Sequence, residues 1–190
     1  MEIHLIRHTS PLIEKGVCYG QSDILLAPSF EEECGKLKMH LPVSVDVVYS
    51  SPLMRCQRLA QALNTKGERI SDKRLMELNF GTWELKKWDD IPFSELDAWM
   101  KDFVNVPAPG GENFAMLYAR ASNFFEEIKK LHCKHVAVVT HAGVIRAVLA
   151  NVLEMPLKNA FKIPVAYASV TRLKLDKAND YCAIDCLSRT

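Results

Sequence analysis

The run Leu5-Ile6-Arg7-His8 ends a short apolar segment, residues 3–6, with a guanidinium and an imidazole. The apolar segment has the length and composition of a buried strand. Packing in a hydrophobic core gives no reason for a strand to stop on Arg7 and His8. A functional site explains this ending, because the strand would carry a reactive side chain and an anion-binding group to the rim of a sheet. We therefore expect the rest of the chain to supply partners at the same rim.

The composition is that of one ordinary globular domain. The chain has 190 residues, of which 48% are hydrophobic and 25% charged, so we expect residues 1–190 to form a single domain with a substantial core. The net charge of +1 gives no general attraction for nucleic acid or for an acidic membrane surface. Affinity for phosphate would therefore depend on a local cluster of side chains. Nothing in the sequence fixes the oligomeric state.

The cellular location is predicted from the start of the chain and from its cysteines. Met1-Glu2-Ile3-His4 has neither the basic region nor the long apolar run of a secretory signal. No apolar run has the length of a membrane-spanning helix. We therefore expect a cytoplasmic protein with no membrane partner, and its six cysteines are expected to be reduced thiols.

Strand-like and helix-like segments alternate along the chain. Apolar, β-branched runs predict strands, and segments that follow N-terminal capping signals predict helices. A capping box at Ser29 and an N-cap at Ser51 are expected to start the first two helices. The predicted strands cover residues 1–7, 45–49, 69–78, 136–140, 165–175 and 181–187, and the predicted helices cover residues 29–40, 52–64, 110–131 and 142–153.

This alternation predicts a three-layer α/β/α sandwich with a mainly parallel central sheet and one antiparallel edge strand. The last two predicted strands follow each other closely, so the antiparallel pairing is expected there. Residues 82–110, which contain three tryptophans and three prolines, fit neither pattern. We interpret them as a lid or insertion with one short helix near residues 93–103. In folds of this class, ligands bind at the carboxyl ends of the parallel strands.

Three predicted strand-to-helix junctions carry similar polar groups. The first strand ends on Arg7 and His8, and the second ends just before Ser51, with Arg55 one turn into the next helix. The strand at residues 136–140 ends on His141. Parallel strands would place all three endings on one rim. Arginines and the amide-rich starts of helices bind phosphate oxygens there without requiring a metal.

Such a rim suits transfer of a phosphoryl group. One histidine can act as the nucleophile if its attacking nitrogen is neutral and its other nitrogen is held by a backbone carbonyl. The second histidine and both arginines would stabilise the charge on the transferring group. Glu77 is the best placed candidate to protonate the leaving oxygen, and Glu84 ranks below it as a second acid or an orienting group. His132 and His135 have metal-like spacing, but a solvated loop is favoured for them.

Four ordered motifs resemble those of the histidine phosphatase superfamily, which includes cofactor-dependent phosphoglycerate mutase. The resemblance implies a phosphoglycerate mutase-like fold, with His8 as the phosphorylated nucleophile and Glu77 as the proton donor. It further implies that Arg7, Arg55 and His141 complete the phosphate pocket, that water hydrolyses the phosphohistidine, and that no metal or other cofactor takes part. The motifs are Leu5-Ile6-Arg7-His8, Ser51-Pro52-Leu53-Met54-Arg55, Glu77-Leu78-Asn79-Phe80-Gly81 and Thr140-His141-Ala142-Gly143.

Within the superfamily, two stretches look most like the alpha-ribazole phosphatases of cobalamin synthesis. They are Tyr19-Gly20-Gln21-Ser22-Asp23 and the segment from Glu77 to Glu84. The resemblance implies a small phosphomonoester substrate, with alpha-ribazole 5'-phosphate as the first candidate.

The chain departs from the family just after His8. Thr9-Ser10-Pro11 stands where the family commonly has Gly, Glu and Thr. The hydroxyl of Thr9 or Ser10 can replace a phosphate contact. Gly20 and the helix start at Ala142 are further predicted phosphate contacts.

Three other functions stay open. A histidine phosphatase of broad specificity is the nearest, because nothing in the sequence reads the rest of the substrate. A phosphoglycerate mutase is less favoured, because such mutases are usually longer and carry a C-terminal tail that shields the phosphoenzyme. The third is a module that binds phosphopeptides without turnover. The presence of His8, Glu77 and His141 together argues against it.

Overall fold

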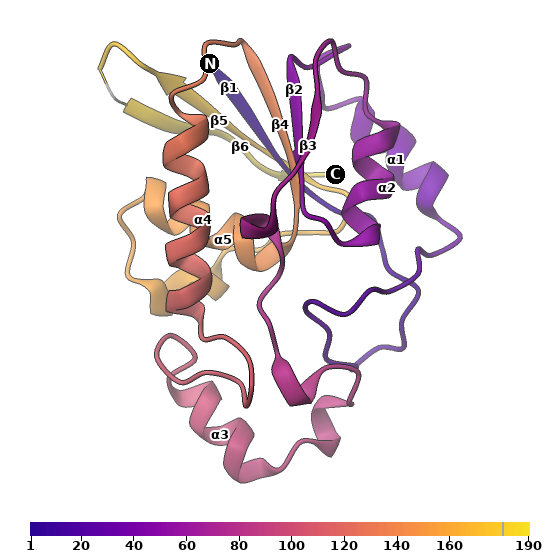
Figure 1. Cartoon of the computed structure of the whole chain (residues 1–190), viewed down its shortest axis with the longest axis vertical. Coiled ribbons are helices and arrows are strands. Elements are labelled where there is room, and N and C mark those ends of the chain that lie inside the picture. The colour runs from indigo at the N-terminus through magenta and orange to yellow at the C-terminus, as the bar shows by residue number, and fades with distance from the viewer. Residues whose placement is uncertain (180) are drawn as a thin grey trace.

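The computed structural model describes residues 1–179 and 181–190. Within these residues, one sheet of six strands has the order β3-β2-β4-β1-β5-β6 (Figure 1). The strands are β1 (Glu2–Arg7), β2 (Val47–Ser50), β3 (Arg69–Ser71), β4 (His135–Thr140), β5 (Val170–Asp176) and β6 (Tyr181–Arg189).

Helices cover both faces of this sheet. Helices α1 and α2 lie on one side and α4 and α5 on the other, whereas α3 lies beyond the end of the sheet (Figure 1). The arrangement confirms the predicted three-layer α/β/α class. No helix among the described residues is long and apolar enough to cross a membrane. The α-helices are α1 (Phe30–Lys38), α2 (Met54–Ala62), α3 (Phe93–Lys101), α4 (Phe114–Ile128) and α5 (Ala142–Val152), with short 3-10 turns η1 (Lys73–Leu75), η2 (Gly81–Trp83), η3 (Trp88–Asp90) and η4 (Leu157–Lys162).

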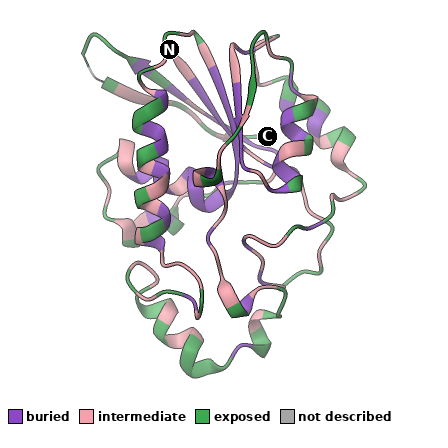
Figure 2. Ribbon diagram, viewed as in Figure 1, coloured by how far each residue is buried: buried purple, intermediate pink, exposed green. Residues whose placement is uncertain are grey.

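The central strands β1 and β4 bring the two site histidines to one level. They pair in parallel, with Leu5 opposite Val138 and Arg7 opposite Thr140. Side chains alternate along each strand, so Leu5 packs with the α4/α5 core and Ile6 packs with the α1/α2 core. Figure 2 shows both strands coloured largely as buried. Because both strands stop at the same height, the residues that follow them are neighbours on the rim.

The antiparallel part of the sheet is larger than predicted. Strand β5 pairs antiparallel with β1 and with β6, whereas the sequence predicted one antiparallel edge strand. Strand β5 also begins at Val170, five residues later than predicted. The loop before β5 instead bonds to the end of β1. Ala168 N donates to His8 O at 3.0 Å, and Ser169 O accepts from Arg7 N at 3.0 Å.

The strand predicted over residues 69–78 is the main local error. It covers only Arg69–Ser71, because Asp72 caps a 3-10 turn by accepting from Arg74 N at 2.8 Å. The chain then runs in an extended form to the rim, where Glu77 lies.

Ser29 is the N-cap residue of α1, as predicted, but its Oγ donates to Glu33 Oε1 at 2.7 Å and does not cap a backbone amide. The N-cap predicted at Ser51 is wrong. Helix α2 has Leu53 as its N-cap, without a capping side chain. The helix bounds nevertheless lie close to those predicted. Their positions are set by the apolar face that packs on the sheet, so they do not depend on the caps.

Residues 82–110 form a separate small cluster below the sheet (Figure 1). Its core is formed by Cys18, Trp83, Ile91 and Ala108, all less than 5% exposed. The expected short helix is α3, which has no buried residue and is largely exposed (Figure 2). This segment therefore packs mainly on itself and on the loop that contains Cys18.

Candidate active site

His8 and His141 come from neighbouring strand ends and lie next to each other. Their ring centroids are 5.1 Å apart, at an interplanar angle of 63°. His8 N donates to Thr140 O at 3.1 Å, which continues the pairing of β1 and β4 by one residue. His8 is 2% exposed and His141 is fully buried. The parallel register thus assembles the pair that the sequence predicted.

The hydrogen bonding of His8 determines which nitrogen is free. Its Nδ1 lies 2.7 Å from Thr9 O, a position that requires Nδ1 to donate. Nε2 of the neutral ring then keeps its lone pair. Burial, followed by the positive charge of Arg55, holds the pKa of His8 well below its usual 6.5. The ring is therefore neutral at physiological pH, which a nucleophilic imidazole requires.

A cavity of about 220 Å³ opens over His8. Of the predicted site residues, Arg7, His8, Glu77 and Ala142 line this cavity. Arg55, His141, Thr9 and Gly20 are not in its described lining. The lining also contains Val17, Tyr19, Leu78, Phe80, Trp88, Phe114, Gly143, Arg146, Phe161 and Tyr167.

Arg7 and Arg55 supply positive charge without a carboxylate partner among the described residues. Arg7 lies over the Tyr167 ring at 3.6 Å, and its Nη1 donates to Val165 O at 2.5 Å. Arg55 is fully buried and donates to Gly20 O at 2.5 Å and to Ser22 O at 2.9 Å.

The Nε of each arginine is buried without a hydrogen-bond partner. Buried charge with unused donors is costly unless an anion is bound. Both guanidiniums are therefore suited to hold a phosphate.

Gly20 is positioned by backbone packing. A Cβ placed there would lie 1.9 Å from Leu78 O, so only glycine allows this loop to reach Arg55. Thr9 is fully buried, and its Oγ1 has no hydrogen-bond partner. The hydroxyl of Thr9 is therefore available, but Thr9 is not in the described cavity lining.

His141 is held by groups that the sequence did not identify. Its Nε2 lies 2.9 Å from Ser51 Oγ and 3.5 Å from Cys56 Sγ. Burial, followed by the charge of Arg55, also keeps the pKa of His141 well below 6.5. Ser51 was interpreted as a helix cap, and a serine just before a helix gives no other local signal. Only the packing of β4 against α2 shows the contact with His141.

Glu77 projects into the cavity from the extended segment after η1. Its Oε1 accepts from Leu78 N at 2.9 Å, and its Oε2 accepts from Gly143 N at 3.1 Å. The carboxyl group is therefore tied to the first turn of α5, beside the histidine pair. This is the side of the cavity from which an acid can reach a leaving oxygen.

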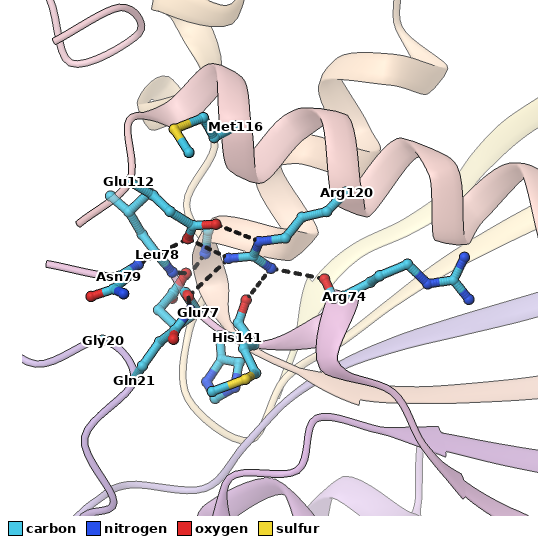
Figure 3. A network of polar contacts seen from close by, with 12 residues as sticks. Gly20, Gln21, Arg74, Glu77, Leu78, Asn79, Glu112, Met116, Arg120 and His141 are labelled. Atoms are coloured by element: carbon cyan, nitrogen blue, oxygen red, sulfur yellow. Dashed lines mark hydrogen bonds and ion pairs between the residues drawn. The ribbon is translucent and has the colours of Figure 1, made fainter. Parts of the chain in front are cut away.

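Arg120 of α4 holds the Glu77 segment from behind (Figure 3). It donates to the carbonyls of Met76 and Glu77 at 2.5 and 2.9 Å, and it forms an ion pair with Glu112 at 2.8 Å. Glu112 in turn accepts from Asn79 N at 3.0 Å. Because a mid-helix arginine is usually solvated, the sequence gave no indication of this positioning role.

Glu84 orients the loops around the site and does not line the cavity. Its carboxylate accepts from the backbone amides of Gln21 and Ser22, both at 2.7 Å, and from Phe80 N at 3.2 Å. Burial works against ionisation, but these hydrogen bonds outweigh it and hold the pKa of Glu84 below its usual value. Glu84 is therefore an ionised loop anchor.

The match to known proteins covers nearly the whole chain. The model of the histidine phosphatase superfamily (branch 1) matches residues 3–184. The chain belongs to this superfamily. Both the predicted family and the phosphoglycerate mutase-like fold are thereby confirmed, and the chain is a phosphomonoesterase of this family.

Its relatives include alpha-ribazole phosphatases, phosphoserine phosphatases and phosphoglycerate mutases. Adenosylcobalamin/alpha-ribazole phosphatase of Salmonella typhimurium is 30% identical over 154 residues, which is 77% of this chain and 69% of that protein. Phosphoserine phosphatase 1 of Hydrogenobacter thermophilus is 28% identical over 141 residues, or 70% of this chain and 66% of that protein. The crystal structure of the alpha-ribazole phosphatase from Shigella flexneri shares the fold, with a TM-score of 0.90 over 99% of this chain and 96% of that one at 23% identity.

The buried histidines predict how stability depends on pH. In the unfolded chain, His8 and His141 take up protons near pH 6.5, whereas in the folded protein their lowered pKa keeps them neutral. The unfolded state therefore binds more protons below pH 6.5, and the free energy of unfolding falls as the pH drops. Each histidine contributes up to about 1.4 kcal/mol per pH unit until its folded pKa is reached.

Urea unfolding between pH 7.5 and 5.0 in phosphate-free buffer measures this loss. The His8→Asn variant should lose stability less steeply than the native chain, whereas His132→Asn, in an exposed loop, should match it. Equal slopes for the native and His8→Asn proteins would contradict the prediction.

A second prediction concerns Gly143, where no side chain fits between α5 and Glu77. A Cβ at Gly143 would lie 2.2 Å from Glu77 Oε1. We expect Gly143→Ala to displace the carboxyl group and to lower kcat for an alkyl phosphate by about 10- to 100-fold, while the helix itself tolerates alanine. Gly35→Ala is the matched control, because a Cβ at Gly35 of α1 meets nothing within 4 Å. An unchanged kcat in Gly143→Ala would show that the position of Glu77 does not limit the reaction.

Proposed function

We propose that this protein hydrolyses a small phosphomonoester through a phosphohistidine at His8. Nε2 of His8 attacks phosphorus and forms the N–P bond while the ester P–O bond breaks. Glu77 gives its proton to the leaving oxygen. Water then attacks the phosphohistidine, Glu77 takes the proton back, and inorganic phosphate leaves. The neutral ring of His8, with Nδ1 held by Thr9 O at 2.7 Å, is the observation that carries this proposal.

The phosphoryl oxygens would be bound by Arg7, Arg55 and His141. Both arginines retain buried, unpartnered donors beside His8. The amide-bearing start of α5 at Ala142 faces the same cavity. These groups would stabilise the negative charge of the transferring group, which is the main catalytic requirement of phosphoryl transfer.

We propose alpha-ribazole 5'-phosphate as the substrate, because the cavity is lined largely by aromatic rings. The lining includes Phe80 and Trp88, with ring centroids 5.4 Å apart, together with Phe161 and Tyr167. Aromatic walls favour a leaving group that carries a planar, apolar ring, such as the benzimidazole of alpha-ribazole. The names of relatives such as that of Salmonella typhimurium support the same choice.

O-phosphoserine is the second candidate, because the Hydrogenobacter thermophilus relative carries its name. Its carboxylate and ammonium groups would require charged partners in the cavity. Arg146 is available for the carboxylate, although its Nε donates to Ile163 O at 3.0 Å and its guanidinium lies 5.0 Å from the Phe161 ring. Glu77 is the one acidic residue of the described lining and is already assigned to proton transfer. The ammonium group thus lacks a partner, which favours alpha-ribazole 5'-phosphate.

Comparison of kcat/KM for the two monoesters tests the substrate. We expect alpha-ribazole 5'-phosphate to be preferred. Phe161→Leu should lower its kcat/KM by about tenfold, because one aromatic contact contributes up to about 1.5 kcal/mol, and should change phosphoserine hydrolysis much less. Phe93→Leu is the control, because Phe93 is 79% exposed and outside the cavity. Faster hydrolysis of phosphoserine would overturn the assignment, and equal rates on unrelated monoesters would indicate a phosphatase of broad specificity.

The remaining alternatives have separate tests. With 3-phosphoglycerate and a bisphosphoglycerate primer, isomerisation faster than phosphate release would indicate a mutase. Retention of a phosphopeptide without release of phosphate would indicate a binding module.

We further propose that residues 82–110 act as the lid of the cavity. Trp88 of this segment lines the cavity, and its backbone N donates to Gly16 O at 2.9 Å.

A further inference from the structure

Three potential metal ligands meet at the end of β1 that lies away from the cavity. Glu2 and His4 are two residues apart on β1, so their side chains share one face of the sheet. The parallel register places His135 of β4 opposite Glu2. Glu2 Oε2 lies 3.4 Å from His135 Nδ1 and 3.8 Å from His4 Nε2. One ligand atom of each residue lies within 4.8 Å of the other two.

The nitrogens of this cluster lack the hydrogen bonds that burial normally demands. His4 is fully buried, and neither of its ring nitrogens has a hydrogen-bond partner. Nδ1 of His135 is also buried without one. An unsatisfied buried polar group is rare and costly in a folded protein, so such a group calls for an unseen partner. Two imidazoles with unpartnered nitrogens, beside a carboxylate, suit a partner that accepts lone pairs, which is a cation.

The backbone around His135 is fixed by Asp46. Its Oδ2 accepts from Lys134 N at 2.7 Å and from His135 N at 2.9 Å. These bonds hold the first residue of β4 against β2. The direction of the His135 side chain is thereby set before any ligand binds.

The neighbouring positive charges are already paired. Arg172 of β5 lies opposite His4, and its Nε donates to Asp185 at 2.6 Å. Lys174 lies opposite Glu2 and forms an ion pair with the same Asp185 at 2.7 Å. Both cations therefore point to Asp185, and neither forms an ion pair with Glu2 among the described residues.

We propose that Glu2, His4 and His135 form a binding site for a divalent transition-metal ion, with Zn²⁺ as the best match. Imidazole nitrogens and a carboxylate oxygen are preferred zinc ligands, at about 2.0–2.2 Å from the ion. A tetrahedral site of that size separates its ligand atoms by about 3.4 Å, so small side-chain rotations complete it. The side chains of Glu2 and His135 are 29% and 32% exposed, which leaves access for the ion and for a water as fourth ligand.

Such an ion would join β1 to β4 without taking part in hydrolysis. His4 and His8 are four residues apart on an extended strand, which is about 13 Å. The ion would therefore be remote from the phosphate and would act on the stability of the sheet. This inference does not depend on the proposed reaction or substrate.

Isothermal titration of the whole chain with Zn²⁺, after treatment with a chelator and in phosphate-free buffer, tests the site. We expect one equivalent to bind. Glu2→Gln and His135→Gln should each raise the dissociation constant at least about tenfold. His132→Gln is the matched control, because His132 is an exposed histidine outside the cluster, and it should bind as the native chain does. Both test variants alter partly exposed side chains, so they should fold even where a change at buried His4 does not.

Two further measurements separate this site from zinc bound elsewhere. Zinc at 100 times its dissociation constant should raise Tm by about 5 °C or more in the native chain but not in Glu2→Gln. His8→Ala should retain the binding. Three results would overturn the proposal. The first is no binding at a zinc concentration of about 10⁻⁴ M, which is far above what a structural zinc site requires. The others are undiminished binding in both test variants and loss of binding in His8→Ala.

Discussion

Replacing His8 by alanine should reduce phosphomonoester hydrolysis by at least about a thousandfold, because no other described side chain in the cavity can form the same covalent intermediate. His8 is the imidazole that lines the cavity, whereas His141 is fully buried and not in the described lining. The variant should still fold, since Ile3, Leu5 and Ile6 of the same strand supply its packing. Steady-state kinetics with an aryl phosphate and far-UV circular dichroism measure the two effects.

Trapping of the intermediate makes the His8 assignment specific. Rapid quenching of the native protein with labelled substrate should give an acid-labile phosphohistidine at position 8, and His8→Ala should give none. His132→Ala, a change in an exposed loop, should retain full activity. A phosphohistidine at another position, His141 included, would refute the assignment.

Replacing Glu77 by glutamine should have an effect that depends on the leaving group. Glutamine keeps the size of the side chain, and its amide oxygen can still accept from one of Leu78 N and Gly143 N, which contact the two carboxyl oxygens in the native chain. It cannot protonate a leaving oxygen. We expect kcat/KM to fall by about 100-fold or more for an alkyl phosphate, whose alkoxide is a poor leaving group. The loss should be less than about tenfold for p-nitrophenyl phosphate, which needs no protonation.

The difference between the two substrates is the critical measurement. Equal losses on both would show that Glu77 positions the substrate and is not the acid. Glu68→Gln, at an exposed surface position, should leave both rates unchanged. Arg120→Met gives an independent check, since Arg120 holds the backbone carbonyls of Met76 and Glu77. This variant should show the same dependence on leaving group in a weaker form.

Much of the site was predictable because it lies where local patterns end. Arg7 and His8 follow an apolar strand, and His141 follows another. The strand pattern alone predicts that these residues lie just outside the core. Because parallel strands end at the same rim of a sheet, the residues are expected to be neighbours there. Register confirms it, because Arg7 lies opposite Thr140.

The residues that hold the machinery were not predictable in the same way. Ser51 has the local features of a helix cap and instead contacts His141. Arg120 lies within a long helix, where an arginine is normally solvated, but its guanidinium spans Glu112 and the Glu77 segment (Figure 3). Their partners are distant in sequence and chosen by packing, so no local spacing identifies them.

The sequence by itself determined the class of fold, the order of its elements and the reactive groups at their ends, because hydrophobic periodicity and junction residues are local properties. Only the tertiary structure decided that β3 stops at Ser71, that β5 also pairs antiparallel with β1, and that Glu84 anchors loops. These depend on which distant amides and carbonyls must be satisfied once the sheet is packed. The cluster of Glu2, His4 and His135 also depends on the tertiary structure, since only the register of β1 and β4 brings His135 to the other two.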